Sequence, residues 1–393
     1  MANDLTFNQI SAVMNEVVKQ ATGREYPSAI DTGSFVTQGQ LALKAGYDPV
    51  LQSISQVLSN TIFSVRPYYR KLAGLEVDEI RWGNHQRKLT NCDSDFEDDA
   101  RYELTDGESV DQYTVKKNKC LQFNFYGQEV FEFQSPTYFR DQLDVAFRSP
   151  EEFGRYITMV TQNATDVIEQ GYESMARMLL ANLIGGKFIT QEDNPDGVVH
   201  LVTEYNAYAG TNLTPITVHA PENFKPFAQW AFGRIRTLRD MMTERNNMYQ
   251  MNVDGYRINR HTPLDRQKIY LVADELNHID ASVLSNTYND EYLRLGDHER
   301  LNFWQSPKMP YQVAVSPSYI DAQGNVVTGG EAVLINYVFG VIFDEEAIGY
   351  TRANQWIGTT PFNAKGGYYN EFYHSTGRWW TDLTEKAVVL MLD

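Results

Sequence analysis

The sequence has 393 residues, enough for two or three domains, and its hydrophobic fraction of 42%, with 13% aromatic residues, excludes a wholly disordered chain. Lys and Arg number 34 against 51 Asp and Glu, so the formal net charge is -17. This charge opposes a broad electrostatic grip on phosphate backbones or anionic membranes, and specific nucleic-acid recognition is not expected.

The cysteines and the first residues narrow the class of protein further. Cys92 and Cys120 have no Cys or His partner at zinc-ligand spacing, so neither a disulfide framework nor a structural metal is expected. The first residues lack the basic and apolar regions of a signal peptide, and no apolar run approaches the roughly 18 residues of a membrane span. We therefore expect a soluble protein made in the cytoplasm.

Residues 1–60 are expected to form an extended arm with short helices. Glycine and serine residues punctuate much of this segment, which is typical of loops. A second helical pattern, over residues 52–69, is disrupted by Pro67. The apolar residues of the first helix recur at three- and four-residue steps: Ile10, Val13, Met14, Val17 and Val18.

Residues 75–119 are charged and polar and hold few core residues. The segments 77–82 and 109–115 have strand character, and Asp106-Gly107 is a turn signal between them. The pattern predicts a long hairpin or loop that projects from the body of the protein.

The clearest helix of the sequence spans residues 150–184. Ser149 can cap it, Pro150 suits its first position, and Glu152 completes a capping box. Apolar residues then recur at helical spacing until the glycines at 185–186, which are expected to end the helix. At 1.5 Å per residue, such a helix is about 50 Å long and would serve as a rigid strut.

Shorter elements complete the chain. Alternating apolar and polar residues predict a half-buried strand over residues 121–133, in which Gly127 is a bulge or bend. Residues 190–224 are expected to be loops with short strands, followed by a helix that starts near Pro226. Asp274 is expected to cap a further helix within a compact α/β unit. Strands are expected at 268–273, 313–315 and 333–343, and a buried final strand at 386–393.

The sequence offers no convincing catalytic, cofactor-binding or metal-binding residues. Residues 185–188 (GGKF) follow a helix and lack the Ser or Thr of a phosphate loop, so a helix C-cap is expected there. The acidic run 93–99 begins with calcium-loop spacing but lacks the glycine and the final glutamate of such a loop. The seven histidines form no HExxH pair. Residues 344–346 (DEE) could supply a glycosidase carboxylate, although such a triplet after a strand is more often a turn.

The order of these elements resembles the α+β fold of the major capsid proteins of tailed bacteriophages, which encapsulins and herpesvirus shells share. That order is an N-terminal arm, a charged hairpin, an aromatic strand, a very long capped helix, a compact α/β unit and a buried terminal strand. Residues 361–369, the pair Phe372-Tyr373 and the strand 384–390 also resemble the C-terminal stretches of such shell proteins.

The resemblance implies a division of the chain. It assigns residues 1–60 to an N-terminal arm, 61–120 to an extended loop over a neighbouring subunit, 121–224 to a peripheral domain with its spine helix at 150–184, 225–345 to an axial domain, and 346–393 to a return to the peripheral domain.

The resemblance also implies a structural major capsid (head) protein that assembles into an icosahedral shell around double-stranded DNA, with no enzymatic activity and no cofactor. Its partners would be copies of itself in hexamers and pentamers, a portal protein and packaged DNA contacted non-specifically, and no membrane. A scaffolding protein would be a separate chain, because no scaffolding segment of about a hundred residues precedes the arm. Assembly would take place in the host cytoplasm and yield the virion capsid. The alternatives are an encapsulin-type compartment or, from another class, a carbohydrate-active enzyme.

A crosslink and the acidic run are the two candidate contacts between subunits of such a shell. The Lys-to-Asn crosslink of some relatives is not identifiable, although lysines at 88, 116, 117 and 119 and asparagines at 354 and 363 are available. The acidic run is expected near the end of the hairpin, facing basic groups of an adjacent subunit, unless it is a solvated loop that keeps the protein soluble. The candidate inter-subunit contacts are Asp93, Asp95, Glu97, Asp98 and Asp99.

Overall fold

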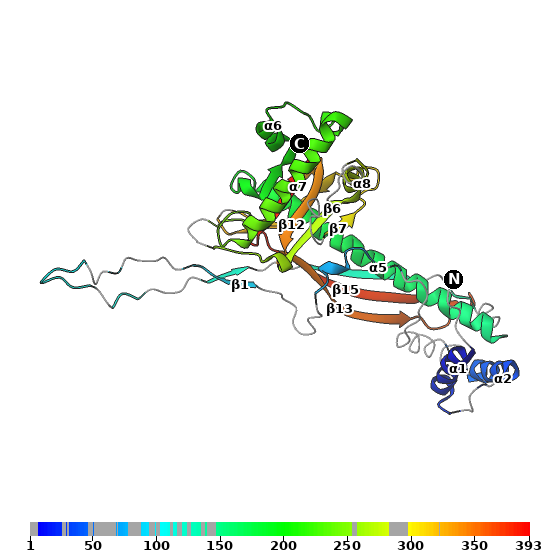
Figure 1. The fold of residues 1–393 in the computed structure, drawn as a ribbon. Helices are drawn as coiled ribbons and strands as arrows, with labels where there is room; N and C mark the ends of the chain where they lie inside the picture. Colours follow the sequence, from blue (N-terminus) through cyan, green and yellow to red (C-terminus); the bar gives the residue numbers. More distant parts are fainter. Residues whose placement is uncertain are drawn as a thin grey trace.

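A long helix, α5 (Pro150–Ile189), organises the molecule (Figure 1). A layered unit of helices and strands covers one end of α5, a three-stranded sheet lies along its middle, and two short helices pack at its other end. The computed structural model describes residues 7–25, 29, 31–45, 50, 68, 70–77, 88–93, 99, 103–110, 113–115, 120–123, 127–134, 138–139, 147–253, 258–282, 298–321 and 323–393.

The start of α5 follows the predicted capping pattern. The Ser149 hydroxyl accepts a 3.2 Å hydrogen bond from the backbone N–H of Glu152, and Pro150 occupies the first helical position. Glu151 and Glu152 lie in the first turn, where their charges suit the positive end of the helix dipole. The predicted N-terminus is confirmed.

The end of α5 differs from the prediction, since the helix continues through the two glycines to Ile189. A Cβ atom on Gly186 would come within 2.7 Å of Leu383 Cδ1, and one on Gly185 would collide with Val315. The glycines are therefore not a C-cap. They are present because other segments of the chain pack directly against this face of the helix.

A five-stranded sheet forms the centre of the layered unit. Its strand order is β5-β16-β12-β6-β7, with β12 antiparallel to both neighbours and parallel pairs at the two edges. The bounds are β5 (Val198–His200), β6 (Gln267–Val272), β7 (Glu299–Leu301), β12 (Val338–Asp344) and β16 (Ala387–Met391). The predicted strands at 268–273 and 386–393 are confirmed, to within a residue or two at their ends.

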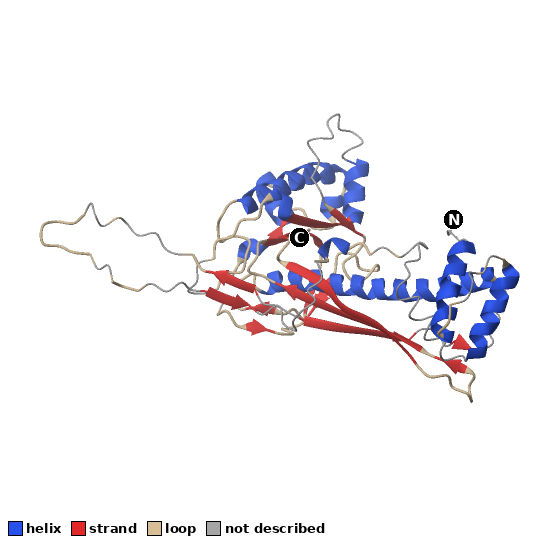
Figure 2. Cartoon of the chain, turned by 90° about the horizontal axis from the view of Figure 1, so that it is seen from below, coloured by secondary structure: helices blue, strands red, loops and turns tan. Residues whose placement is uncertain are grey.

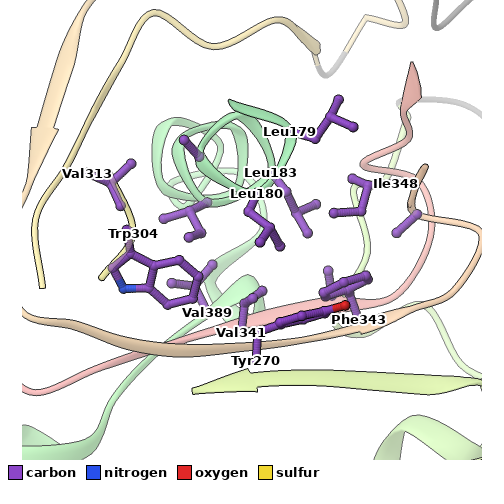
Figure 3. Packing of buried hydrophobic residues seen from close by; sticks show 14 of the residues in the cluster. Leu179, Leu180, Leu183, Tyr270, Trp304, Val313, Val341, Phe343, Ile348 and Val389 are labelled. Atoms are coloured by element: carbon purple, nitrogen blue, oxygen red, sulfur yellow. The ribbon is translucent and has the colours of Figure 1, made fainter. Parts of the chain in front are cut away.

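The central strands β12 and β16 are buried on both faces, which explains why they are apolar at nearly every position, whereas the edge strand β7 exposes Glu299 and Arg300. Val389 and Phe343 pack toward α5, with Leu179, Leu180 and Leu183 of that helix (Figure 3). The neighbouring side chains Val388 and Ile342 pack on the opposite face, against the helices that cover it. The final strand thus lies between two hydrophobic clusters.

Three helices belong to the second face: α6 (Leu201–Ala209), α7 (Pro221–Thr243) and α8 (Ala273–Ser282). Helix α6 replaces the loops predicted within 190–224, and α7 begins at Pro221 with Pro226 inside it. Asp274 lies in the first turn of α8 rather than at its cap. Single turns of 3-10 helix lie at Ala73–Leu75, Pro195–Gly197, Thr217–His219 and Leu264–Arg266.

A three-stranded antiparallel sheet, ordered β13-β15-β3, lies along the middle of α5 (Figure 2). Its strands are β3 (Gly127–Gln134), β13 (Ile348–Thr359) and β15 (Glu371–Thr381). The predicted strand over 121–133 is divided between β2 (Cys120–Phe123) and β3, which belong to different sheets. Two-stranded pairs join β14 (Tyr368–Tyr369) to β4 (Tyr138–Phe139), β10 (Val326–Val327) to β9 (Tyr319–Ile320), and β11 (Val333–Ile335) to β8 (Val313–Val315).

The N-terminal segment has more core than the sequence suggested. Helices α1 (Phe7–Thr22) and α2 (Thr32–Ala45) pack on the first turns of α5, and the five apolar residues predicted for the first helix are all buried. Phe35 of α2 is fully buried and its ring lies 5.8 Å from that of Phe153. The short helices expected in the arm are confirmed, whereas the expected lack of core is wrong for these residues, because α2 supplies a second apolar face. The helical pattern over 52–69 lies outside the described residues, apart from Tyr68.

The hairpin begins with β1 (Lys88–Asn91), which pairs with β2 in antiparallel register, Asn91 opposite Cys120. Its described residues extend away from the body (Figure 1). Gly107 has φ 97, which the turn at the far end requires. The strand predicted at 109–115 is wrong for its described residues, none of which is in a strand.

Candidate assembly surfaces

The chain that leads into the hairpin is anchored by a ring of four charged side chains. Arg70 contacts Glu76 and lies 3.1 Å from Glu169 of α5. Arg352 of β13 lies 3.1 Å from Glu76 and 2.5 Å from Glu169. Each cation thus faces both anions, and the Arg70 side chain is only 7% exposed. The ring fixes the position of residues 70–77 on the long helix and on the sheet.

Aromatic rings lie beneath this charged ring. Tyr172 and Tyr350 are stacked with centroids 5.9 Å apart, and the Arg352 guanidinium lies 4.7 Å from the Tyr172 centroid. Val77 N donates a 2.9 Å hydrogen bond to the Tyr350 carbonyl oxygen. No local pattern in the sequence indicated this anchor, because its members come from three distant segments.

A second anchor lies at the base of the hairpin itself, at Asp93. Its Oδ1 accepts a 2.5 Å hydrogen bond from Arg245 Nη2. Its Oδ2 accepts bonds from the Asn259 side chain at 2.7 Å and from the Asn259 backbone N–H at 3.1 Å. Both carboxylate oxygens are therefore engaged within the same chain.

This geometry corrects the expected place of Asp93 in the hairpin. Asp93 lies at the base of the hairpin rather than near its end, and its partners belong to its own chain. Asp99 is exposed. Asp95, Glu97 and Asp98 lie outside the described residues. For all five acids the contact with an adjacent subunit stays a prediction.

The far part of the hairpin presents apolar side chains to solvent. All residues at 103–110 and 113–115 are exposed, and the exposed fractions of Tyr113 and Val115 reach 84% and 80%. Leu104 and Val110 add to this surface. Exposed apolar side chains gathered on a projecting element are typical of a surface that another molecule covers.

The face of the three-stranded sheet opposite α5 also exposes an aromatic side chain. Trp356 of β13 is 54% exposed and stacks on His374 of β15, with ring centroids 3.8 Å apart. The register places these two residues directly opposite each other. The stack thus presents one aromatic surface on this face of the sheet.

The acidic triplet at 344–346 is engaged within the chain. Glu345 and Glu346, which sequence alone left open as glycosidase carboxylates, both pair with Arg266. Asp344 accepts a 2.8 Å bond from the Thr262 hydroxyl. Within the described part of the chain, no group of three His, Cys, Asp or Glu could hold a metal ion, and no helix is long and apolar enough to cross a membrane.

The fold has counterparts among solved phage structures. A chain from the capsid structure of Staphylococcus phage Andhra has a TM-score of 0.52 at 9% identity, over 85% of this chain and 87% of that chain. A chain from the structure of the head fiber and inner core protein of native bacteriophage P68 has a TM-score of 0.53 at 9% identity, with the same coverage of 85% and 87%. At this identity the likeness establishes the fold alone.

The sequence itself gives the family. No curated protein sequence matches the chain. The profile of the Phi29-like phage major capsid proteins, in contrast, matches residues 14–391. This match includes most of the helical N-terminal unit, the hairpin, α5 and the three- and five-stranded sheets. The chain therefore belongs to the Phi29-like phage major capsid protein family and is a structural protein of the virion that assembles with its own copies into the shell of the phage head.

Proposed function

We propose that the chain forms an icosahedral shell around double-stranded DNA, built from hexamers and pentamers with heterologous contacts between neighbouring subunits. In this role it has no catalytic activity and needs no cofactor. An encapsulin-type compartment is not favoured, since the matching family is one of phage capsid proteins. A carbohydrate-active enzyme is not favoured either, because Arg266 pairs with Glu345 and Glu346 and Asp344 accepts a hydrogen bond from Thr262.

The exposed apolar end of the hairpin is the observation that carries the proposal. Tyr113 and Val115 extend into solvent from an element that leaves the body of its own subunit behind (Figure 1). A neighbouring copy is the surface that such an element can cover. A contact between two different surfaces of identical chains closes into rings when the rotation between copies is that of a five- or sixfold axis.

We further assign the layered unit, with the five-stranded sheet and α6 to α8, to the axial domain, and α5 with the three-stranded sheet to the peripheral domain. Strands β5 and β16 share a sheet with β12, although the expected boundaries at 225 and 346 separate them from it. The hydrogen bonds of this sheet favour moving both strands into the axial domain.

The remaining partners follow from the role of a shell. A separate scaffolding protein would guide assembly in the host cytoplasm, and a portal protein would occupy one vertex. Packaged DNA would be contacted non-specifically, because each subunit has a net charge of -17, which opposes adhesion of the DNA to the shell.

Assembly of the purified protein tests the proposal. Electron microscopy at high concentration, with the scaffolding partner present, is expected to give closed shells. The double variant Tyr113→Ser with Val115→Ser should lose shells while its thermal unfolding stays unchanged, since neither side chain contributes to a core. A wild-type protein that sediments only as a monomer across salt and crowding conditions would contradict the proposal.

The acidic run has its own test. Replacement of Asp95, Glu97, Asp98 and Asp99 by Asn or Gln should slow assembly and flatten its dependence on ionic strength, because opposite charges across an interface mainly raise the association rate. Light scattering at two ionic strengths measures both quantities. Identical rates and salt slopes for the two proteins would leave solubility as the explanation of the run.

A further inference from the structure

The loop that follows α7 holds the base of the hairpin through the residues at its two ends, 245–246 and 259–260, which together are called the seat. Arg245 and Asn259, which hold Asp93, lie at the two ends of this loop. Asn246 and Arg260, the residues that directly follow these two in the chain, pair as an antiparallel bridge, with N–H to O distances of 3.1 and 3.0 Å. The two residues that contact the hairpin are therefore held next to each other by backbone hydrogen bonds.

The seat is itself fixed to the interior of the subunit. Arg260 forms an ion pair with Glu385 at 3.1 Å, and Glu385 is only 4% exposed. The buried ammonium of Lys386 donates to the Glu244 carbonyl oxygen at 2.7 Å and to Asn246 Oδ1 at 2.8 Å. These partners lie directly before β16, so the seat cannot shift without disturbing the five-stranded sheet.

The chain is thus held to the body at two separate places, one before the hairpin and one at its base. One is the ring of Arg70, Glu76, Glu169 and Arg352 on α5 and β13, and the other is the contact of Asp93 with the seat. Of the two, only the contact of Asp93 lies on the hairpin itself, so it restricts the directions in which the rest of the hairpin can leave the body. The side chain of Asp93 is 21% exposed and accepts three hydrogen bonds, so its position is well determined.

We infer that Asp93, through Arg245 and Asn259, sets the direction in which the hairpin leaves its subunit, and thereby selects the angle between neighbouring subunits and the diameter of the shell. The consequence for shell diameter rests on the proposed assembly, whereas the direction of the hairpin is a property of the single subunit. Asp93 is accordingly a positioning residue. Its effect on a neighbouring subunit is transmitted by the direction of the hairpin.

The first part of the experiment measures the hairpin direction without any need for shells. Spin labels are placed on Thr105→Cys in the hairpin and Thr237→Cys on α7, in a Cys92→Ser, Cys120→Ser background, and the labelled protein is diluted with unlabelled protein. The D93N variant keeps the shape of the side chain but weakens its bonds to both partners. Its distance distribution should be about twofold broader than that of the unmodified protein, as expected for a segment whose contact with the body is weakened.

Matched variants distinguish the contact of Asp93 with Arg245 and Asn259, here called the clamp, from a general loss of charge. D106N removes the same charge from the exposed turn at the far end of the hairpin and should leave the distribution unchanged. R245A should broaden it as D93N does, the double variant should be no broader than either single one, and R245K should restore it in part. An unchanged distribution in D93N, or equal broadening in D106N, would overturn the inference.

The second part measures the shells by cryo-electron microscopy. D93N is expected to give a wider spread of particle diameters than the wild-type protein or D106N, while the midpoint of thermal unfolding stays the same. If the label distances broaden while the particle diameters stay unchanged, the clamp sets the direction of the hairpin but does not select the diameter of the shell. A wild-type protein that forms no shells would instead contradict the proposed function, and the label distances would still test the clamp.

Discussion

The ammonium of Lys187, near the end of α5, donates a 2.9 Å hydrogen bond to the backbone carbonyl oxygen of Tyr249. It also lies 3.2 Å from the carbonyl oxygen of Leu383 and 3.5 Å from that of Glu385, so three N–H bonds meet three carbonyl groups. Tyr249 has φ 68, in the left-handed region that costs about 1 kcal/mol for a residue with a side chain. The bond to Lys187, together with that from Ala387 N at 2.8 Å, holds it there.

Lys187 predicts a rise in stability with pH. Burial lowers its pKa from 10.5 to about 7, although Asp382 and Glu385 oppose the shift. Between these two values the unfolded chain binds a proton that the folded chain does not, so the free energy of unfolding rises with pH across the window. The variant K187M should lack this contribution. Urea unfolding of both proteins from pH 6.5 to 9.5 measures the difference, which should move in favour of the wild type as pH rises.

The matched control for this experiment is K365M, because Lys365 is exposed in the turn before β14. Its stability should follow that of the wild type at every pH. Parallel curves for the wild type and K187M would contradict the prediction.

His219 predicts the opposite dependence on pH. Its Nε2 lies 3.0 Å from Glu275 Oε2 and its Nδ1 lies 2.7 Å from the Pro215 carbonyl oxygen, and the hydrogen bond to Glu275 is the main reason why its pKa is raised above 6.5. The resulting stability is fully present below pH 6.5 and is lost as pH rises through the raised value. Hydrogen exchange of residues 211–219 should therefore become faster over this range in the wild type. In H219Q the exchange, corrected for its intrinsic dependence on pH, should stay constant.

Replacing one glycine in each of two helices by alanine should change the free energy of unfolding in opposite directions. G186A in α5 forces a methyl group against Leu383 and should lower the free energy of unfolding by about 1 to 3 kcal/mol. G233A in α7 meets no atom within 4 Å and should raise it by about 0.5 to 1 kcal/mol, because alanine has the higher helix propensity. Denaturant unfolding measures both values. A neutral G186A would show that the contact with Leu383 can relax.

The N-terminal helices predict a local loss of structure. Phe35→Ala removes a fully buried ring that packs on Phe153, at a cost of about 3 to 5 kcal/mol to the helices around it. Amide exchange in α1 and α2 should become faster, while exchange in β16 stays slow. The exposed neighbour Gln40→Ala serves as the control. If exchange in α1 is the same in both variants, then this unit has little core of its own, as the sequence had suggested.

The sequence by itself determined the features that depend on neighbours within a few residues. The cap of α5 could be predicted because Ser149 and Glu152 are three residues apart, and α1 because its apolar residues recur at helical steps. The continuous apolar run of β16 predicted a buried strand. The order of such elements was also enough for the resemblance to phage capsid proteins, which the family match then confirmed.

The tertiary structure decided what depends on residues far apart in the chain. Two glycines in a row have the same local signature whether they end a helix or admit a neighbour, and only the approach of Leu383 to Gly186 distinguishes the two. In the same way, Asp93 is one acid in an acidic run until the fold brings Arg245, 152 residues later, to its carboxylate. Local patterns report the intrinsic preference of a segment, whereas its partners are chosen by the packing of the whole chain.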